Sequence, residues 1–159
     1  MKIDHPFPPL YSGHSRVLIL GSFPSVKSRE QLFFYGHPQN RFWGVIAAIF
    51  GEQKPQSIDE KKALILDHDL ALWDSIASCE ISGSSDSSIR NAKPNDLSII
   101  LENSQVDRIY CNGRKSHELY RKYIEPITGI EAVCLPSTSP ANAQFTMDKL
   151  INAWAVIRE

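Results

Sequence analysis

An aromatic and amide-rich stretch, FFYGHPQNRFWGVI at 33–46, holds groups suited to a nucleobase and to a phosphate. Tyr35 offers a flat face on which a base can stack, a contact worth roughly 1–3 kcal/mol. Asn40 offers a carboxamide that can orient water or a polar edge, and Arg41 can meet a phosphate. The competing interpretation is structural: Phe42 is a core residue at the start of a helix, which we favour, and Asn40 also caps that helix.

A second candidate is GSFPS at 21–25, which follows an apolar run. The glycine and the proline make a sharp turn, and Ser22 and Ser25 can donate hydrogen bonds to a phosphate. The stretch is neither a Walker loop nor a G-x-G-x-x-G loop, because it lacks the second glycine and the lysine. By itself it therefore identifies no ligand.

Two further polar stretches follow later runs. In CNGRKS, Asn112 can read a base edge as donor and acceptor together, or it can simply form a turn, while Arg114 and Lys115 fit solvated charges as well as ligands. LPSTSPANA at 135–143 is rich in hydroxyl groups, and its backbone amides can hold a phosphate unless it is an ordinary capped loop.

Alternating strands and helices must position these residues. Continuous apolar runs predict buried strands at 16–22, 70–76, 106–113 and 130–137. Helical spacing and capping signals predict helices at 40–51, 57–68, 114–124 and 143–158, and a short one that begins at Asn95 or Asp96. Residues 1–16 are expected to be an extended lead-in, with loops at 22–39 and 80–95.

This alternation predicts an α/β fold, a three-layer α/β/α sandwich around a central four-stranded, mainly parallel sheet. The whole chain, 1–159, is expected to form one domain. Ligands of such sheets bind beyond the carboxyl ends of the strands. The polar stretches that follow the four strands, GSFPS, WDS, CNG and LPSTSPAN, should therefore meet at one rim.

Composition excludes several classes. The net charge of −1 gives no global basic field, so contact with nucleic acid must come from a local patch. No membrane-spanning run or signal peptide is found, which predicts a cytoplasmic protein. Cys79, Cys111 and Cys134 have no metal-site spacing and are expected to be buried thiols, so no metal is predicted. Asp4 and His5 are expected at the surface.

Taken in order, these motifs resemble those of the uracil-DNA glycosylase superfamily, and more closely its mismatch-specific thymine/uracil and hypoxanthine branches. The family's first motif, G-x-[DN]-P, corresponds to Gly21–Pro24, and its stacking aromatic to Tyr35. H-P-x-N-R-F-W corresponds to His37–Trp43, and D-L-S to Asp96–Ser98. The strand-end Asn-Gly corresponds to Asn112–Gly113, and the second motif to Ser137–Asn142. The resemblance covers nearly the whole chain.

Three departures from the family pattern are informative. Phe23 stands where the family has the water-positioning acid or amide, Ser137 where it has His or Asn, and Ala141 where it has the wedge residue. Such losses resemble the hypoxanthine-DNA glycosylase branch, in which the Asn of H-P-x-N acts in catalysis. That role falls on Asn40, and the iron–sulfur branches are excluded because their clustered cysteines are absent.

The resemblance implies a monomeric, monofunctional DNA glycosylase that needs no cofactor and flips a deaminated base, hypoxanthine first, out of DNA. In this hypothesis Asn40 is catalytic. The base is bound by Tyr35, which stacks on it, with Asn112, which reads its edge, and Phe23. DNA contacts are expected from Ser22, Ser25, Arg41, Lys115, Ser137, Ser139, Ala141 and Asn142.

Three alternatives stay open. One is a G·U or G·T mismatch glycosylase, which needs a smaller pocket. Another is a lesion-binding protein without catalysis, since Phe23 cannot polarise water. The third is a small-molecule nucleotide-binding domain.

Overall fold

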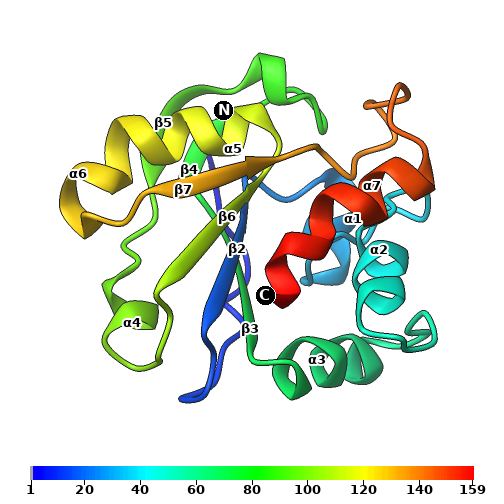
Figure 1. Ribbon diagram of the computed structural model, residues 1–159. Coiled ribbons are helices and arrows are strands. Elements are labelled where there is room, and N and C mark those ends of the chain that lie inside the picture. The colour runs from blue at the N-terminus through cyan, green and yellow to red at the C-terminus, as the bar shows by residue number, and fades with distance from the viewer. Residues whose placement is uncertain (1) are drawn as a thin grey trace.

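The computed structural model of the protein describes residues 2–159, and its centre is a parallel sheet (Figure 1). The strands are ordered β3-β2-β6-β7 and all neighbours run parallel. The predicted four-stranded parallel sheet is therefore confirmed. Its strands are β2 (Val17–Gly21), β3 (Leu70–Asp74), β6 (Arg108–Asn112) and β7 (Ala132–Leu135).

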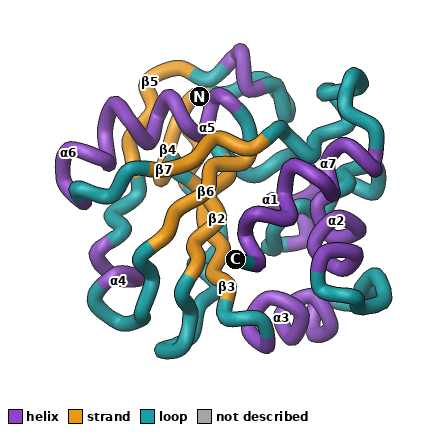
Figure 2. Tube along the Cα trace, viewed as in Figure 1, coloured by secondary structure: helices purple, strands orange, loops and turns teal. Residues whose placement is uncertain are grey.

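Helices cover both faces of this sheet, as the apolar pattern of the strands requires (Figures 1 and 2). Along β2, Val17 and Ile19 pack into one hydrophobic core, while Leu18 and Leu20 pack into another on the opposite face. A strand buried on both faces reads as a continuous apolar run. The expected three-layer α/β/α sandwich is confirmed. One face carries α2 (Phe42–Ile49), α3 (Ile58–Asp67) and α7 (Met147–Trp154), and the other α4 (Ser98–Leu101), α5 (Arg114–Leu119) and α6 (Glu125–Thr128).

Side-chain caps fix where two helices begin. The Ser57 hydroxyl accepts from the backbone N–H of Glu60 at the start of α3, as the capping signal predicts. Thr146 does the same for Lys149 in α7, so this helix begins later than the predicted 143. α7 continues as the 3₁₀ turn η3 (Ala155–Arg158), and α5 runs through the π-helical turn η2 (Tyr120–Ile124) into α6.

A second, antiparallel sheet was missed by the sequence analysis. β1 (Lys2–Asp4), β4 (Ile76–Glu80) and β5 (Arg90–Pro94) pair in the order β1-β4-β5, in segments expected to be a lead-in, the end of a strand and a polar loop. β1 and β5 expose most of their residues, so neither has an apolar run. The segment 22–39 likewise contains a helix, α1 (Val26–Gln31), and the polar loop a 3₁₀ turn, η1 (Asp86–Ser88).

This second sheet brings the N-terminal segment to the rim of the parallel sheet. The backbone N–H of His5 donates to the carbonyl oxygen of Ala77 at 2.7 Å, and Leu10 pairs with Leu72 of β3. The expectation that His5 lies at the surface is therefore wrong, because its side chain is only 4 % exposed. None of the helices among residues 2–159 has the length and apolar character needed to cross a membrane.

Candidate active site

A cleft of about 1010 Å³ opens where the strands of the parallel sheet end. The tails of β2, β3, β6 and β7 all contribute to its wall, as do the loop before α2 and the turn η1. The predicted convergence of the polar stretches at one rim is thus confirmed. Every site residue predicted from the sequence lines this cleft except Arg41 and Lys115; those that do are Ser22, Phe23, Ser25, Tyr35, Asn40, Asn112, Ser137, Ser139, Ala141 and Asn142.

A chain of hydrogen bonds through Thr138 joins the two candidate asparagines. The Asn112 amide Nδ2 donates to Thr138 Oγ1 at 3.0 Å, and Thr138 Oγ1 donates to Asn40 Oδ1 at 2.8 Å. The backbone N–H of Thr138 in turn donates to Asn112 Oδ1 at 3.0 Å. Asn40 Oδ1 also accepts the backbone N–H of Phe42 at 2.9 Å. Thr138 is fully buried, and the sequence analysis gave it no role.

The donors and acceptors in this series of hydrogen bonds fix the orientation of both amides. A backbone N–H can only donate, so the atom of Asn40 that meets Phe42 must be the carbonyl oxygen. Both lone pairs of that oxygen are then used, and the NH₂ group is the end of Asn40 left for a ligand. Asn112 keeps one further donor and one further acceptor position. Asn40 thus caps the first N–H of α2 although Arg41 occupies the N-cap position.

The ring of Tyr35 packs against the core, and its hydroxyl points into the protein interior. The ring stacks on Phe42 with 4.0 Å between centroids and 22° between planes, so one face is occupied. The hydroxyl is buried and no described group reaches it with hydrogen-bond geometry, although the Asn112 amide lies near enough to lower its pKa. Burial raises the pKa of Tyr35 well above its usual value, and the charge of Asp74 adds to this. The phenol therefore stays protonated and remains a donor.

Phe23 is buried at the wall of the cleft and offers no polar atom, but two carboxyl groups lie nearby that sequence reasoning missed. Asp74 ends β3, and Asp86 belongs to η1. Asp74 belongs to the WDS tail expected at the rim, and Asp86 to the segment expected to be a polar loop. Only the fold places both beside Phe23.

Asp86 faces the first polar turn. Its Oδ1 accepts from the Ser22 hydroxyl at 2.7 Å. Desolvation at the cleft wall raises the pKa of the Asp86 carboxyl and the charge of Asp74 raises it further, whereas the Ser22 hydrogen bond and Lys115 oppose the shift. Lys115 thus acts on the cleft through Asp86, while its neighbour Arg114 lines the cleft.

Arg41 organises the loop that the sequence analysis linked to phosphate. Its guanidinium donates to the carbonyl oxygens of Ser139 at 2.9 Å, Asn142 at 3.0 Å and Phe145. These bonds hold the loop after β7 against the start of α2. Arg41 therefore shapes the candidate phosphate site from behind, and its predicted contact with phosphate stays a prediction.

Two hydroxyl groups of that loop, those of Ser137 and Ser139, accept hydrogen bonds and keep their protons free. Ser137 Oγ accepts the backbone N–H of Ser139, and Ser139 Oγ accepts that of Ala141, both at 3.1 Å. Neither hydroxyl donates to a protein group among residues 2–159. Two backbone amides are thus occupied, but the two hydroxyl protons can point to an anion in the cleft. Ser25 is the N-cap of α1, where its Oγ accepts from the N–H of Ser28.

Comparison of the sequence and the fold with known proteins finds similarity to DNA glycosylases. The profile of the uracil DNA glycosylase superfamily matches residues 8–158. A hypoxanthine DNA glycosylase of Methanosarcina acetivorans is 35 % identical over 98 % of this chain and 99 % of its own length. One from Methanosarcina barkeri is 32 % identical over 94 % of each chain. The solution NMR structure of a candidate uracil DNA glycosylase from M. acetivorans superposes with a TM-score of 0.83 at 32 % identity, covering 99 % of this chain and 98 % of that one.

Proposed function

Because the chain belongs to the uracil DNA glycosylase superfamily and is a DNA glycosylase, we propose that it removes hypoxanthine from DNA. The enzyme would flip the deaminated nucleotide into the cleft and hydrolyse its N-glycosidic bond, the first step of base excision repair. Two relatives named hypoxanthine DNA glycosylase, each matching nearly the full length, support this substrate.

The observation that carries the proposal is the fixed carboxamide of Asn40 in a cleft with room for a purine nucleotide. At about 1010 Å³ the cleft lies at the upper end of the roughly 300–1000 Å³ usual for ligand sites. Thr138 and the N–H of Phe42 hold Asn40 Oδ1 from two sides, so the NH₂ group points to a defined place. A catalytic group that is held before the substrate arrives costs no reorganisation.

The chemistry suits a site without an acid at position 23. The N-glycosidic bond breaks to a sugar cation and a departing base anion, and hypoxanthine leaves more easily than adenine because its oxo form disperses the charge. A water that accepts a hydrogen bond from the Asn40 NH₂ keeps a second lone pair for the sugar carbon. Since the sugar cation is strongly electrophilic, a water that is held in position adds to it without prior deprotonation. The proton that the water loses on forming the sugar hydroxyl neutralises the departed base anion.

DNA contacts follow from the rim of the cleft. The free protons of Ser137 and Ser139 can donate to a phosphate oxygen, and Arg114 supplies a positive charge beside them. Phe23 and the open side of Tyr35 would enclose the base. Ala141 is exposed at the same rim and offers no bulk to fill the space the base leaves.

The test is base release from a labelled duplex with one hypoxanthine, and in parallel with uracil opposite guanine. We expect release of hypoxanthine by the wild type and a loss of about 100-fold or more in Asn40→Ala, the order of a catalytic positioning group. Asn40→Asp is the comparison variant, because it keeps an oxygen that caps α2 and replaces the NH₂ donor by a charged carboxylate oxygen that cannot donate. It should also lose activity while unfolding at the wild-type temperature.

The other outcomes assign the alternatives. Release of uracil alone would move the enzyme to the mismatch-specific branch. Tight binding to the hypoxanthine duplex without release of either base would make the protein a lesion binder and end the proposal.

A further inference from the structure

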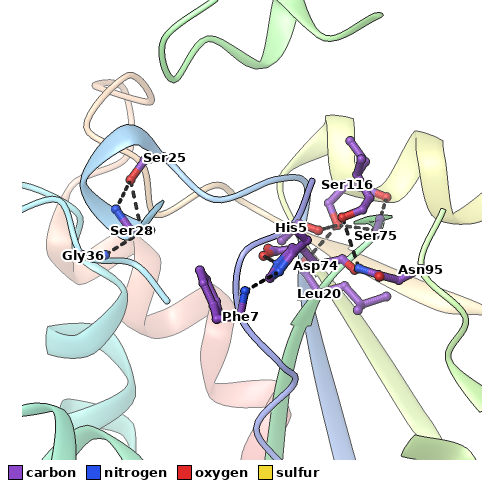
Figure 3. A network of polar contacts seen from close by, with 12 residues as sticks. His5, Phe7, Leu20, Ser25, Ser28, Gly36, Asp74, Ser75, Asn95 and Ser116 are labelled. Atoms are coloured by element: carbon purple, nitrogen blue, oxygen red, sulfur yellow. Dashed lines mark hydrogen bonds and ion pairs between the residues drawn. The ribbon is translucent and has the colours of Figure 1, made fainter. Parts of the chain in front are cut away.

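A buried carboxylate and imidazole pair lies at the wall of the cleft, which Asp74 lines. His5 Nε2 and Asp74 Oδ2 are 2.7 Å apart, and the two side chains are 4 % and 5 % exposed (Figure 3). The backbone of Asp74 is held as well, because its carbonyl oxygen accepts from Asn95 Nδ2 at 2.8 Å. β1 delivers His5 by pairing with β4, and Phe7 packs edge-on against the imidazole at 4.5 Å.

The contacts of His5 decide which oxygen of Asp74 is free. The backbone N–H of Phe7 donates to His5 Nδ1 at 3.5 Å, so the ring proton sits on Nε2 and is donated to Asp74 Oδ2. Among residues 2–159 no donor reaches Oδ1, and Asp74 lines the cleft. Asp74 Oδ1 is therefore a fixed hydrogen-bond acceptor that is free to bind a ligand in the cleft.

Gly21 makes room for this acceptor and for an unused donor beside it. A Cβ at position 21 would lie 2.3 Å from Asp74 Oδ1 and 3.1 Å from the Tyr35 hydroxyl. Both atoms thus converge on the glycine that ends β2. The Tyr35 hydroxyl is buried without a partner. Buried polar groups are nearly always hydrogen-bonded, so the Tyr35 hydroxyl indicates a ligand that accepts a hydrogen bond at this point. Asp74 Oδ1 beside it offers the same ligand an acceptor.

We propose that Asp74, positioned by His5, accepts the N–H of a lactam and that Tyr35 donates to the adjacent carbonyl oxygen. This inference rests on the proposed function and names how that site recognises deamination. Hypoxanthine presents N1–H and O6 to the pair, and uracil presents the same O=C–N–H unit. Adenine held in the same orientation presents a lone pair at N1 and an amino group at C6, which inverts both contacts.

The two contacts also have opposite effects on the leaving base. A carboxylate beside N1 opposes the negative charge that develops as the base departs, whereas a hydroxyl on O6 stabilises it. Asp74 therefore serves selection and Tyr35 serves both selection and rate. In this arrangement Tyr35 acts through its hydroxyl, not through the ring face expected from the sequence, and the face contact is left to Phe23. Guanine carries the same lactam, so its exclusion depends on its stable pairing and its 2-amino group.

The experiment compares single-turnover release of hypoxanthine and of 1-methylhypoxanthine, which lacks the N–H, from otherwise identical duplexes. The wild type should prefer hypoxanthine at least 100-fold. Asp74→Asn should lower hypoxanthine release 10- to 1000-fold and reduce the preference to within a few-fold. Asp107→Asn is the matched control, because this exposed aspartate precedes β6 at the opposite end of the sheet. It should behave as the wild type.

Tyr35→Phe separates the hydroxyl from the ring and guards against a folding defect at Asp74. We expect hypoxanthine release to fall 10- to 100-fold with an unfolding temperature equal to or above that of the wild type, because the variant removes a buried hydroxyl without a partner. Full activity in Tyr35→Phe, or an unchanged 1-methyl preference in folded Asp74→Asn, would overturn the inference. Absence of hypoxanthine release by the wild type would instead end the proposed function.

Discussion

At the scale of single residues, Thr138 is the group on which both candidate asparagines depend. It donates to Asn40, accepts from Asn112 and is fully buried, so it orients two amides from within the wall of the cleft. Side chains that position others in this way commonly decide whether a site is held tightly enough to act.

Thr138→Val keeps the shape of the side chain and removes its hydroxyl. We expect a loss of about 1–3 kcal/mol in the free energy of unfolding, because Asn112 and Asn40 each lose a buried partner, and a fall of at least 10-fold in base release. Thr138→Ser retains the hydroxyl and should keep most of the activity. Urea unfolding and single-turnover release measure the two effects. Equal activity in the Val and Ser variants would show that the chain of hydrogen bonds does not orient Asn40.

At the scale of elements, the second sheet and its turn η1 complete a site that the parallel sheet leaves open. β1 supplies His5 and η1 supplies Asp86, which anchors the turn after β2 through Ser22. The charged form of the Asp86 carboxyl is destabilised in the folded protein. Its pKa is raised above the ordinary value of 3.8, mainly by desolvation and further by the charge of Asp74.

This shift has a definite sign for stability. The folded state binds the Asp86 proton more tightly than the unfolded state, so the contribution of this group falls as the pH rises from 3.8 through the raised pKa. Asp86→Asn removes the charge. We expect the variant to match the wild type below pH 3.8 and to gain stability over it as the pH rises, reaching a plateau near neutrality. Thermal unfolding from pH 3 to 8 measures this, and a variant that loses stability with rising pH would contradict it.

At the scale of the whole molecule, burial divides the three thiols. Cys79 and Cys111 are buried, and burial raises the pKa of Cys111 to about 12. The expectation that all three thiols are buried is wrong for Cys134, which is exposed on β7 beside the cleft. β7 ends the sheet, so one of its sides has no neighbouring strand to cover it.

A thiol reagent should therefore modify one cysteine in the native protein and three in denaturant. The reaction of Cys134 should be slow at pH 7, because desolvation raises the pKa of its thiol too. Absorbance of the released thiolate counts the sites, and Cys134→Ser should abolish the native reaction. Rapid modification of two or three thiols in the native protein would mean that the hydrophobic clusters around Cys79 and Cys111 open readily.

The sequence by itself determined the four parallel strands and most of the cleft. Runs such as VLIL in β2 are apolar on both faces, and the polar tails of parallel strands must meet at one rim because all strands end on the same side. Asn40, Asn112 and Ser139 were therefore placed correctly at the cleft from sequence alone.

Only the tertiary structure decided how these residues are partnered. Nothing in the sequence near Asn40 shows that Thr138, 98 positions away, saturates its oxygen. His5 and Asp74 are 69 positions apart, and His5 is brought to Asp74 by β1, a short strand that exposes most of its residues and carries no apolar signal. Hydrophobic periodicity reports which face an element buries, whereas a hydrogen bond between distant segments depends on how those elements dock.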